Sequence, residues 1–151
     1  PEQIQVVVHP QSIIHSMVQF EDGAVMAQLG IPDMKLPISY AFSYPERLKS
    51  SAPRLDFNQY STLTFEEPDM TRFRNLAFAF DAVKKGGNMP CILNAANEVV
   101  VEAFLKDRIG FLQMREVIEQ TMCKASFVPT PSYDDYVRSD EEVRLIAASL
   151  F

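Results

Sequence analysis

Apolar positions along this chain change their spacing before its middle, from the alternation typical of strands to the three- and four-residue spacing of helices. Residues 4–9 and 14–20 are rich in β-branched side chains and predict two strands. Residues 24–29 predict a third strand, and the intervening Asp22-Gly23 pair is typical of a hairpin turn. Because three strands do not close a core, we expect another segment or another subunit to cover one face of this meander.

Prolines divide the next part of the chain. Residues 37–42 predict a short helix with Pro37 near its first position, and Pro45 ends it. Residues 46–67 are polar and marked by proline, which is typical of a linker, and 63–65 are predicted to pair briefly as a strand.

Helical periodicity predicts four helices in the remaining residues. The first helix ends at Gly86-Gly87, and its apolar stripe contains Phe73, Leu76, Phe80 and Val83. The second runs from Asn94 or Asn97 to Lys106, and the third runs from Leu112 to Ala125. The fourth begins at the capping box Ser139-Asp140-Glu141-Glu142. The fold class is therefore α+β. We expect the end of a larger catalytic domain over 1–45, a linker over 46–67, and a small four-helix bundle over 68–151.

Composition excludes several classes of partner. The net charge of −6 argues against nucleic acid and anionic membrane surfaces, which select basic proteins. No apolar run approaches the roughly 18 residues that span a bilayer. Cys91 and Cys123 lack the spacing of a metal site, so we expect two free, buried thiols in a reducing compartment and a cytoplasmic location.

Candidate chemistry gathers near the predicted hairpin. His15, within an apolar strand, is either a core or interface residue or part of a functional pocket, whereas His9, before a proline, suits a structural role. Asp33 lies on a loop typical of catalytic residues and of ordinary turns alike. Met34, beside Pro32, could form an apolar wall for a ligand or pack in the core.

Elsewhere the sequence offers no complete active site. The polar cluster Asn94-Ala95-Ala96-Asn97-Glu98 is explained by capping of a helix, with Glu98 near the positive end of the helix dipole. Glycine-rich nucleotide loops, a G-x-S-x-G elbow and a C-x-x-C pair are not found. The spacing of the two histidines matches no metal site.

Several blocks nevertheless follow one another in a recognisable order. They are His9-Pro10-Gln11-Ser12-Ile13-Ile14-His15-Ser16-Met17, Asp22-Gly23, Ala27-Gln28-Leu29-Gly30-Ile31-Pro32-Asp33-Met34, Pro45-Glu46-Arg47, Leu55-Asp56-Phe57, Leu63-Thr64-Phe65 and Leu93-Asn94-Ala95-Ala96-Asn97-Glu98. In this order the chain resembles the 1-deoxy-D-xylulose 5-phosphate reductoisomerases, and the resemblance weakens after about residue 122.

The resemblance implies a three-part enzyme. An N-terminal Rossmann-like domain would bind NADPH, a central domain would hold Mg²⁺ or Mn²⁺, the substrate and the dimer contact, and a four-helix domain would follow a linker. The reaction would isomerise 1-deoxy-D-xylulose 5-phosphate and reduce the product to 2-C-methyl-D-erythritol 4-phosphate, a step of non-mevalonate isoprenoid synthesis. This chain matches the end of the central domain and everything after it.

The family's metal, cofactor and phosphate ligands belong to segments before Pro1, so the resemblance implies no catalytic, cofactor-binding or metal residue here, and no activity or bound cofactor for the chain alone. It implies a position near the sugar phosphate substrate for His15, Pro32, Asp33 and Met34. It also implies a homodimer through the N-terminal strands. Two alternatives are a non-enzymatic oligomerisation or scaffold module, and a small hydrolase built around the histidines, for which no nucleophile–base pair is evident.

Overall fold

The computed structural model describes residues 2–151 and divides them into two compact units. One unit comprises Val6–Pro68 and the other comprises residues 2–5 with Asp69–Phe151. The first unit contains a small antiparallel sheet and one helix, and the second contains four packed helices. The α+β class predicted from the hydrophobic pattern is confirmed.

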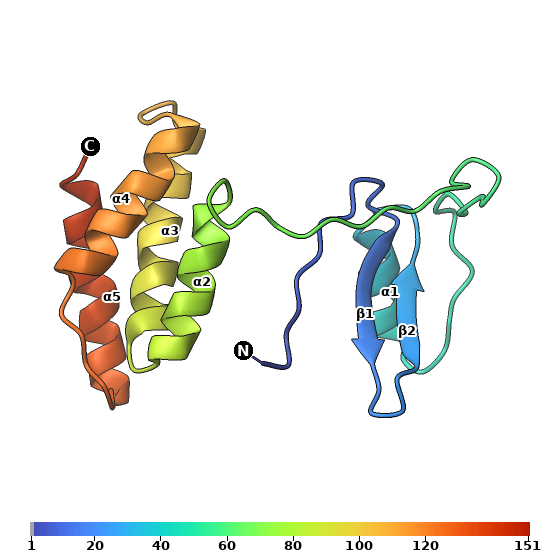
Figure 1. The fold of residues 1–151 in the computed structure, drawn as a ribbon, viewed down its shortest axis with the longest axis horizontal. Coiled ribbons are helices and arrows are strands. Elements are labelled where there is room, and N and C mark those ends of the chain that lie inside the picture. The colour runs from blue at the N-terminus through green and yellow to red at the C-terminus, as the bar shows by residue number, and fades with distance from the viewer. Residues whose placement is uncertain (1) are drawn as a thin grey trace. The chain divides into compact units, whose positions relative to one another are not determined.

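The sheet is a hairpin of β1 (Ile14–Gln19) and β2 (Val25–Leu29), joined by a tight turn (Figure 1). Gly23 has φ 86°, a conformation that glycine adopts without strain. The Asp22 carboxylate accepts a hydrogen bond from the backbone N–H of Ala24 at 2.9 Å, which holds the turn closed. The predicted hairpin is therefore confirmed, with its turn at the predicted Asp-Gly pair.

The first predicted strand is wrong. Residues 4–9 form no strand, and Val8 makes an isolated antiparallel bridge with Glu66 through two backbone hydrogen bonds of 2.9 Å. The pairing stops there because Pro10 has no N–H to extend it. The brief pairing that we predicted at residues 63–65 occurs at the next residue, and the rest of the 46–67 segment contains no helix or strand.

Helix α1 (Lys35–Ser43) follows the hairpin after a short loop. It begins two residues before Pro37, which places the proline in the first turn, where a missing backbone N–H breaks no helical hydrogen bond. The predicted helix at this position is confirmed, and the chain leaves it at Tyr44.

Four helices form the second unit, as predicted: α2 (Arg74–Lys85), α3 (Met89–Leu105), α4 (Phe111–Lys124) and α5 (Tyr133–Ala148). Helix α3 contacts the other three, and Figure 1 shows it among them. The core side chains are Phe78, Ala82, Met89, Ile92, Ala95, Ala96, Val100, Ala103, Ile109, Met114, Val117, Ile118, Val143 and Ala147. This is a continuous apolar core of the kind that stabilises a helical bundle.

Two helices begin earlier than predicted. Helix α3 begins at Met89, with a proline in its first turn, so Asn94 and Asn97 lie inside it and cap nothing. Helix α5 begins at Tyr133, because Ser132 forms the capping box with Asp135 at 2.6–3.2 Å. The capping box that we expected at Ser139 is therefore wrong.

The buried face of α2 and the burial of the thiols also differ from expectation. Phe78 and Ala82 are buried, whereas the predicted stripe residues Phe73 and Val83 are half exposed. Both cysteines are free as predicted, but Cys123 is exposed, because it faces outward from α4.

Asn88, just before α3, is fully buried and hydrogen-bonded on every side. Its amide Nδ2 donates to the Ser126 carbonyl and to the Ser139 hydroxyl, both at 2.9 Å, and its Oδ1 accepts from the Val128 N–H at 2.9 Å. The side chain thus joins the start of α3 to the α4–α5 loop and to α5. A buried amide satisfied in this way fixes how these elements pack.

Candidate functional site

His15 lies on β1 and is exposed to solvent in this chain. It falls at an irregularity of the hairpin, because Ile14 pairs with Leu29 while Ser16 pairs with Gln28. His15 is therefore the extra residue of a β-bulge, a feature that redirects a side chain and is frequent beside active sites. Its exposure excludes the core alternative within this chain and leaves the interface and pocket alternatives.

The loop from Gly30 to α1 carries the other three candidate residues. The carboxylate of Asp33 accepts a hydrogen bond from the backbone N–H of Lys35 at 2.9 Å. Asp33 therefore closes an ordinary turn at the start of the helix. Pro32 is exposed, and 71% of Met34 is exposed, so the alternative in which Met34 packs in the core is wrong.

A backbone hydrogen bond brings the two segments together. The N–H of Gly30 donates to the carbonyl of Ile13 at 3.0 Å, so the loop starts beside the residue that precedes β1. Ile13 is 1% exposed and is the one buried side chain among the described residues of this unit. No hydrogen bond or ion pair in the described part of the chain joins His15 to residues 32–34.

His9 has the structural role that its position suggested. Its Nδ1 lies 2.8 Å from the carbonyl oxygen of Thr64, and its ring stacks on Phe65 with 5.0 Å between the centroids. Since a carbonyl oxygen accepts hydrogen bonds and cannot donate them, Nδ1 carries the proton. Sequence reasoning missed Thr64 and its partner Gln11, because these residues lie 53 positions apart and no local pattern links them.

The polar cluster of α3 ties two helices together. Arg144 of α5 donates to Glu98 at 2.6 Å and to Asp140 at 2.7 Å, and Asn94 donates to Glu98 at 3.0 Å. The hydrogen bond from Arg144, followed by that from Asn94, lowers the pKa of Glu98. Because the ionic side chains are about half exposed, this network contributes little to stability.

We had expected Glu98 near the helix start, and this is wrong because α3 begins well before it.

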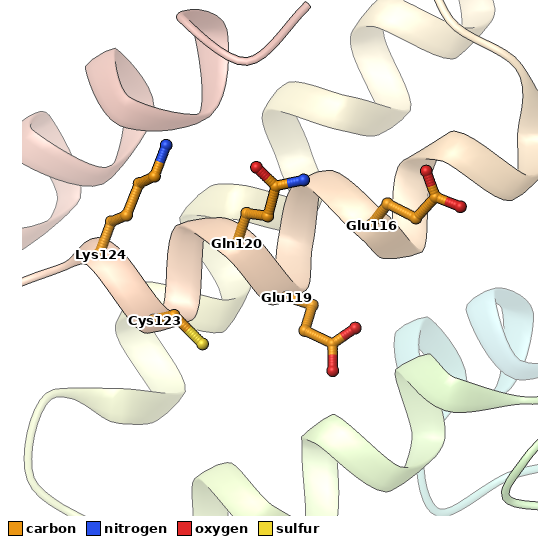
Figure 2. A pocket seen from close by; sticks show the side chains of 5 residues that line it. All are labelled: Glu116, Glu119, Gln120, Cys123 and Lys124. Atoms are coloured by element: carbon orange, nitrogen blue, oxygen red, sulfur yellow. The ribbon is translucent and has the colours of Figure 1, made fainter.

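The surface of α4 carries a shallow hollow, shown in Figure 2. Its lining residues are Glu116, Glu119, Gln120, Cys123 and Lys124, all on this helix. Glu119 forms an ion pair with Arg74 of α2. No group of three or more His, Cys, Asp or Glu side chains within residues 2–151 is placed to hold a metal ion. The described residues that line the hollow therefore do not form a metal site.

None of the helices that the structure describes is long and apolar enough to cross a membrane.

Comparison with known protein families shows to which family this chain belongs. The model of the DXP reductoisomerase C-terminal domain matches residues 29–146. The chain belongs to this family. The match begins at Leu29, the last residue of β2, and covers α1 and almost all of the helical bundle, and the resemblance noted in the sequence is confirmed.

Reductoisomerases from two bacteria are similar to this chain over almost its whole length. A 1-deoxy-D-xylulose 5-phosphate reductoisomerase of Phocaeicola vulgatus is 69% identical over 150 residues, which are 99% of this chain and 39% of that protein. The enzyme of the same name from Porphyromonas gingivalis is 52% identical over 150 residues, with the same two shares. The chain therefore spans about two fifths of the length of these DXP reductoisomerases.

Solved structures agree in fold. The Zymomonas mobilis reductoisomerase in complex with NADPH is 43% identical with a TM-score of 0.86, covering 99% of this chain and 39% of that one. A DOX-P reductoisomerase in complex with NADPH, fosmidomycin and magnesium is 38% identical with a TM-score of 0.85, covering 98% of this chain and 38% of that one.

Proposed function

We propose that this chain is the C-terminal portion of a reductoisomerase that depends on NADPH and a divalent metal. The enzyme converts 1-deoxy-D-xylulose 5-phosphate to 2-C-methyl-D-erythritol 4-phosphate in non-mevalonate isoprenoid synthesis. The observation that carries the proposal is the 69% identity to a reductoisomerase along 99% of the chain. Residues 1–45 end its central domain, residues 46–67 are the connection, and residues 68–151 are its C-terminal helical domain.

The chain's own residues do not fit the metal or NADPH. Residues 2–151 contain no cluster of three metal-binding side chains, and the sequence has no glycine-rich nucleotide loop. We therefore assign no step to either group through this chain, and we place their ligands in the remaining part of the enzyme.

Four residues of this chain lie near the substrate in the proposal. The bulge presents the His15 imidazole, which donates or accepts a hydrogen bond and orients the sugar phosphate. Pro32 and Met34 are exposed apolar side chains and would exclude water from one side of the substrate. Asp33, held in the turn that starts α1, fixes the loop that carries them.

We propose that the enzyme is a homodimer through its N-terminal strands. Val18 and Met26 are paired across the hairpin and are 58% and 67% exposed. Within the described residues the sheet has two strands, so each has an edge without a strand neighbour. Apolar side chains beside open edges favour association with another copy.

Two free cysteines support a reducing location such as the cytoplasm.

The first test is NADPH oxidation with 1-deoxy-D-xylulose 5-phosphate and Mg²⁺. We expect no turnover by the 151-residue chain alone, and turnover once it is combined with the N-terminal portion of a close relative. Turnover by the chain alone would contradict our placement of the chemistry. Absence of turnover in both cases, with both parts shown to be folded and associated, would favour the scaffold alternative.

The second test concerns His15 in the assembled enzyme. We expect His15→Ala to lower kcat/KM roughly 10²-fold, because the substrate loses an orienting group. Asn58→Ala, an exposed change outside the hairpin, is the control and should leave kcat/KM within twofold of the parent. Equal effects of the two substitutions would refute the role of His15.

A further inference from the structure

Three side chains fasten together two segments that are far apart in the sequence. His9 Nδ1 donates to the Thr64 carbonyl at 2.8 Å, and Gln11 Nε2 donates to the Thr64 hydroxyl at 2.8 Å. In return the backbone N–H of Thr64 donates to the side-chain oxygen Oε1 of Gln11 at 3.1 Å. We call His9, Gln11 and Thr64 the Thr64 clasp. Beside it, the backbone bridge of Val8 with Glu66 and the stacking on Phe65 extend the same contact.

The clasp holds the turn that leads into β1. The N–H of Ser12 donates to the carbonyl of His9 at 3.0 Å, and Ser12 has φ 56°, a left-handed conformation that a serine adopts at some cost. The next residue is Ile13, which is buried and accepts the hydrogen bond from Gly30. Two residues further along is His15. The clasp is therefore connected through one tight turn to both segments of the candidate site.

We propose that His9, Gln11 and Thr64 are positioning residues that set the placement of His15 relative to the loop at residues 30–34. This inference rests on the proposed function. The residues act through Ile13 and touch no substrate. Their hydrogen bonds lie at the surface, where water competes with them, so the loss of one of them has a modest, local effect. A small displacement of an orienting group is enough to reduce turnover strongly.

Paired substitutions separate the clasp from general stability. Thr64→Val removes the hydroxyl and keeps the shape and the backbone groups, whereas Thr64→Ser keeps the hydroxyl. His9→Phe keeps a ring beside Phe65 and loses the Nδ1 donor, whereas His9→Asn retains an amide donor near that position. No described residue bonds to His9 Nε2, so asparagine loses no hydrogen bond there. Asn58→Ala is the control, because it removes one local hydrogen bond of the 46–67 segment.

The first readout does not depend on enzyme activity. Amide hydrogen exchange in the 151-residue chain measures the opening of the hydrogen bond from Gly30 to Ile13. We expect Thr64→Val and His9→Phe to speed exchange at Gly30 about tenfold, the factor for loss of one hydrogen bond. Thr64→Ser, His9→Asn and Asn58→Ala should leave it near the parent value. Unchanged exchange at Gly30 in Thr64→Val and His9→Phe would overturn the proposal.

The second readout is kinetic and uses the assembled enzyme. We expect Thr64→Val to lower kcat about tenfold with a smaller change in KM, and Thr64→Ser to restore it. Loss of kcat in Thr64→Val and Asn58→Ala alike would overturn the proposal, because it would reflect general damage to the segment. If the parent enzyme itself shows no reductoisomerase turnover, the proposed function fails, and the exchange experiment still decides whether the clasp holds the two segments.

Discussion

At the scale of single residues, polar side chains act mainly by satisfying backbone groups. Asp33 closes the turn before α1, and Asp135 closes the capping box of α5 with Ser132. These hydrogen bonds alone account for the position of each carboxylate, without a bound ligand. The hydroxyl of Ser132, its backbone N–H and then Arg138 lower the pKa of Asp135 from 3.8 to about 2.

This lowered pKa predicts how acid affects the bundle. Because the pKa of Asp135 is lower in the folded state, its contribution is present above about pH 3.8 and is lost as the pH falls towards 2. We expect Asp135→Asn to lower Tm at neutral pH, and the difference from the parent to vanish near pH 2. Circular dichroism melts across this range measure it. Asp134→Asn removes a neighbouring charge without touching the cap, so an equal pH-dependent difference there would contradict the assignment.

At the scale of elements, helix ends differ in how much the rest of the fold constrains them. The chain leaves α2 through Gly86 and Gly87, both with positive φ. A Cβ on Gly86 would meet nothing within 4 Å, whereas one on Gly87 would overlap the carbonyl oxygen of Val128. One glycine is therefore required by backbone conformation alone, and the other also by the close approach of the α4–α5 loop.

The two glycines provide a matched experiment. We expect Gly86→Ala to lower the free energy of unfolding by about 1–3 kcal/mol, because φ 69° with ψ −151° is a backbone conformation essentially confined to glycine. Gly87→Ala should cost about 1–3 kcal/mol more, because the methyl group overlaps backbone. Urea titrations of both variants give the comparison. Equal losses would show that the loop moves aside freely.

The residue at which a helix begins was the feature of the fold that was hardest to predict from the sequence. The chain contains two Ser-x-x-acidic patterns, at Ser132 and Ser139, and only the second was predicted to start this helix. The structure uses the first, and Ser139 instead lies buried, donating to the carbonyl of Asp135 and accepting from Asn88. By contrast, the hairpin and the presence of four helices follow from local signals and were predicted correctly, although the buried face of α2 was not.

The candidate site shows the same division. The sequence could point to His15 and to residues 32–34 as separate segments. Their connection at Ile13 and Gly30, and the fastening by Thr64, depend on contacts between residues far apart in the chain. Periodicity and turn signals carry no information about such contacts.

At the scale of the whole molecule, the two units differ in how much they bury. Residues 69–151 contain a continuous apolar core, whereas the hairpin unit has one buried side chain among its described residues. Since apolar burial is the main favourable term in folding, the helical unit is the more stable of the two.

Separate expression tests this difference. We expect residues 69–151 alone to show helical circular dichroism and one cooperative thermal transition. We expect residues 6–68 alone to show weak amide protection throughout. Cooperative unfolding of the 6–68 fragment would contradict this expectation, and so would a helical fragment that melts without a transition.

The buried amide of Asn88 has a consequence for the order of folding. Its three partners lie 38, 40 and 51 positions along the chain, so its hydrogen bonds form after the helices have associated. We expect Asn88→Ala to leave the refolding rate almost unchanged and to accelerate unfolding at least tenfold. Stopped-flow measurements over a range of urea concentrations separate the two rates, and slower refolding would instead place Asn88 in the folding nucleus. Asn88 therefore governs how long the helical unit stays folded more than how quickly it forms.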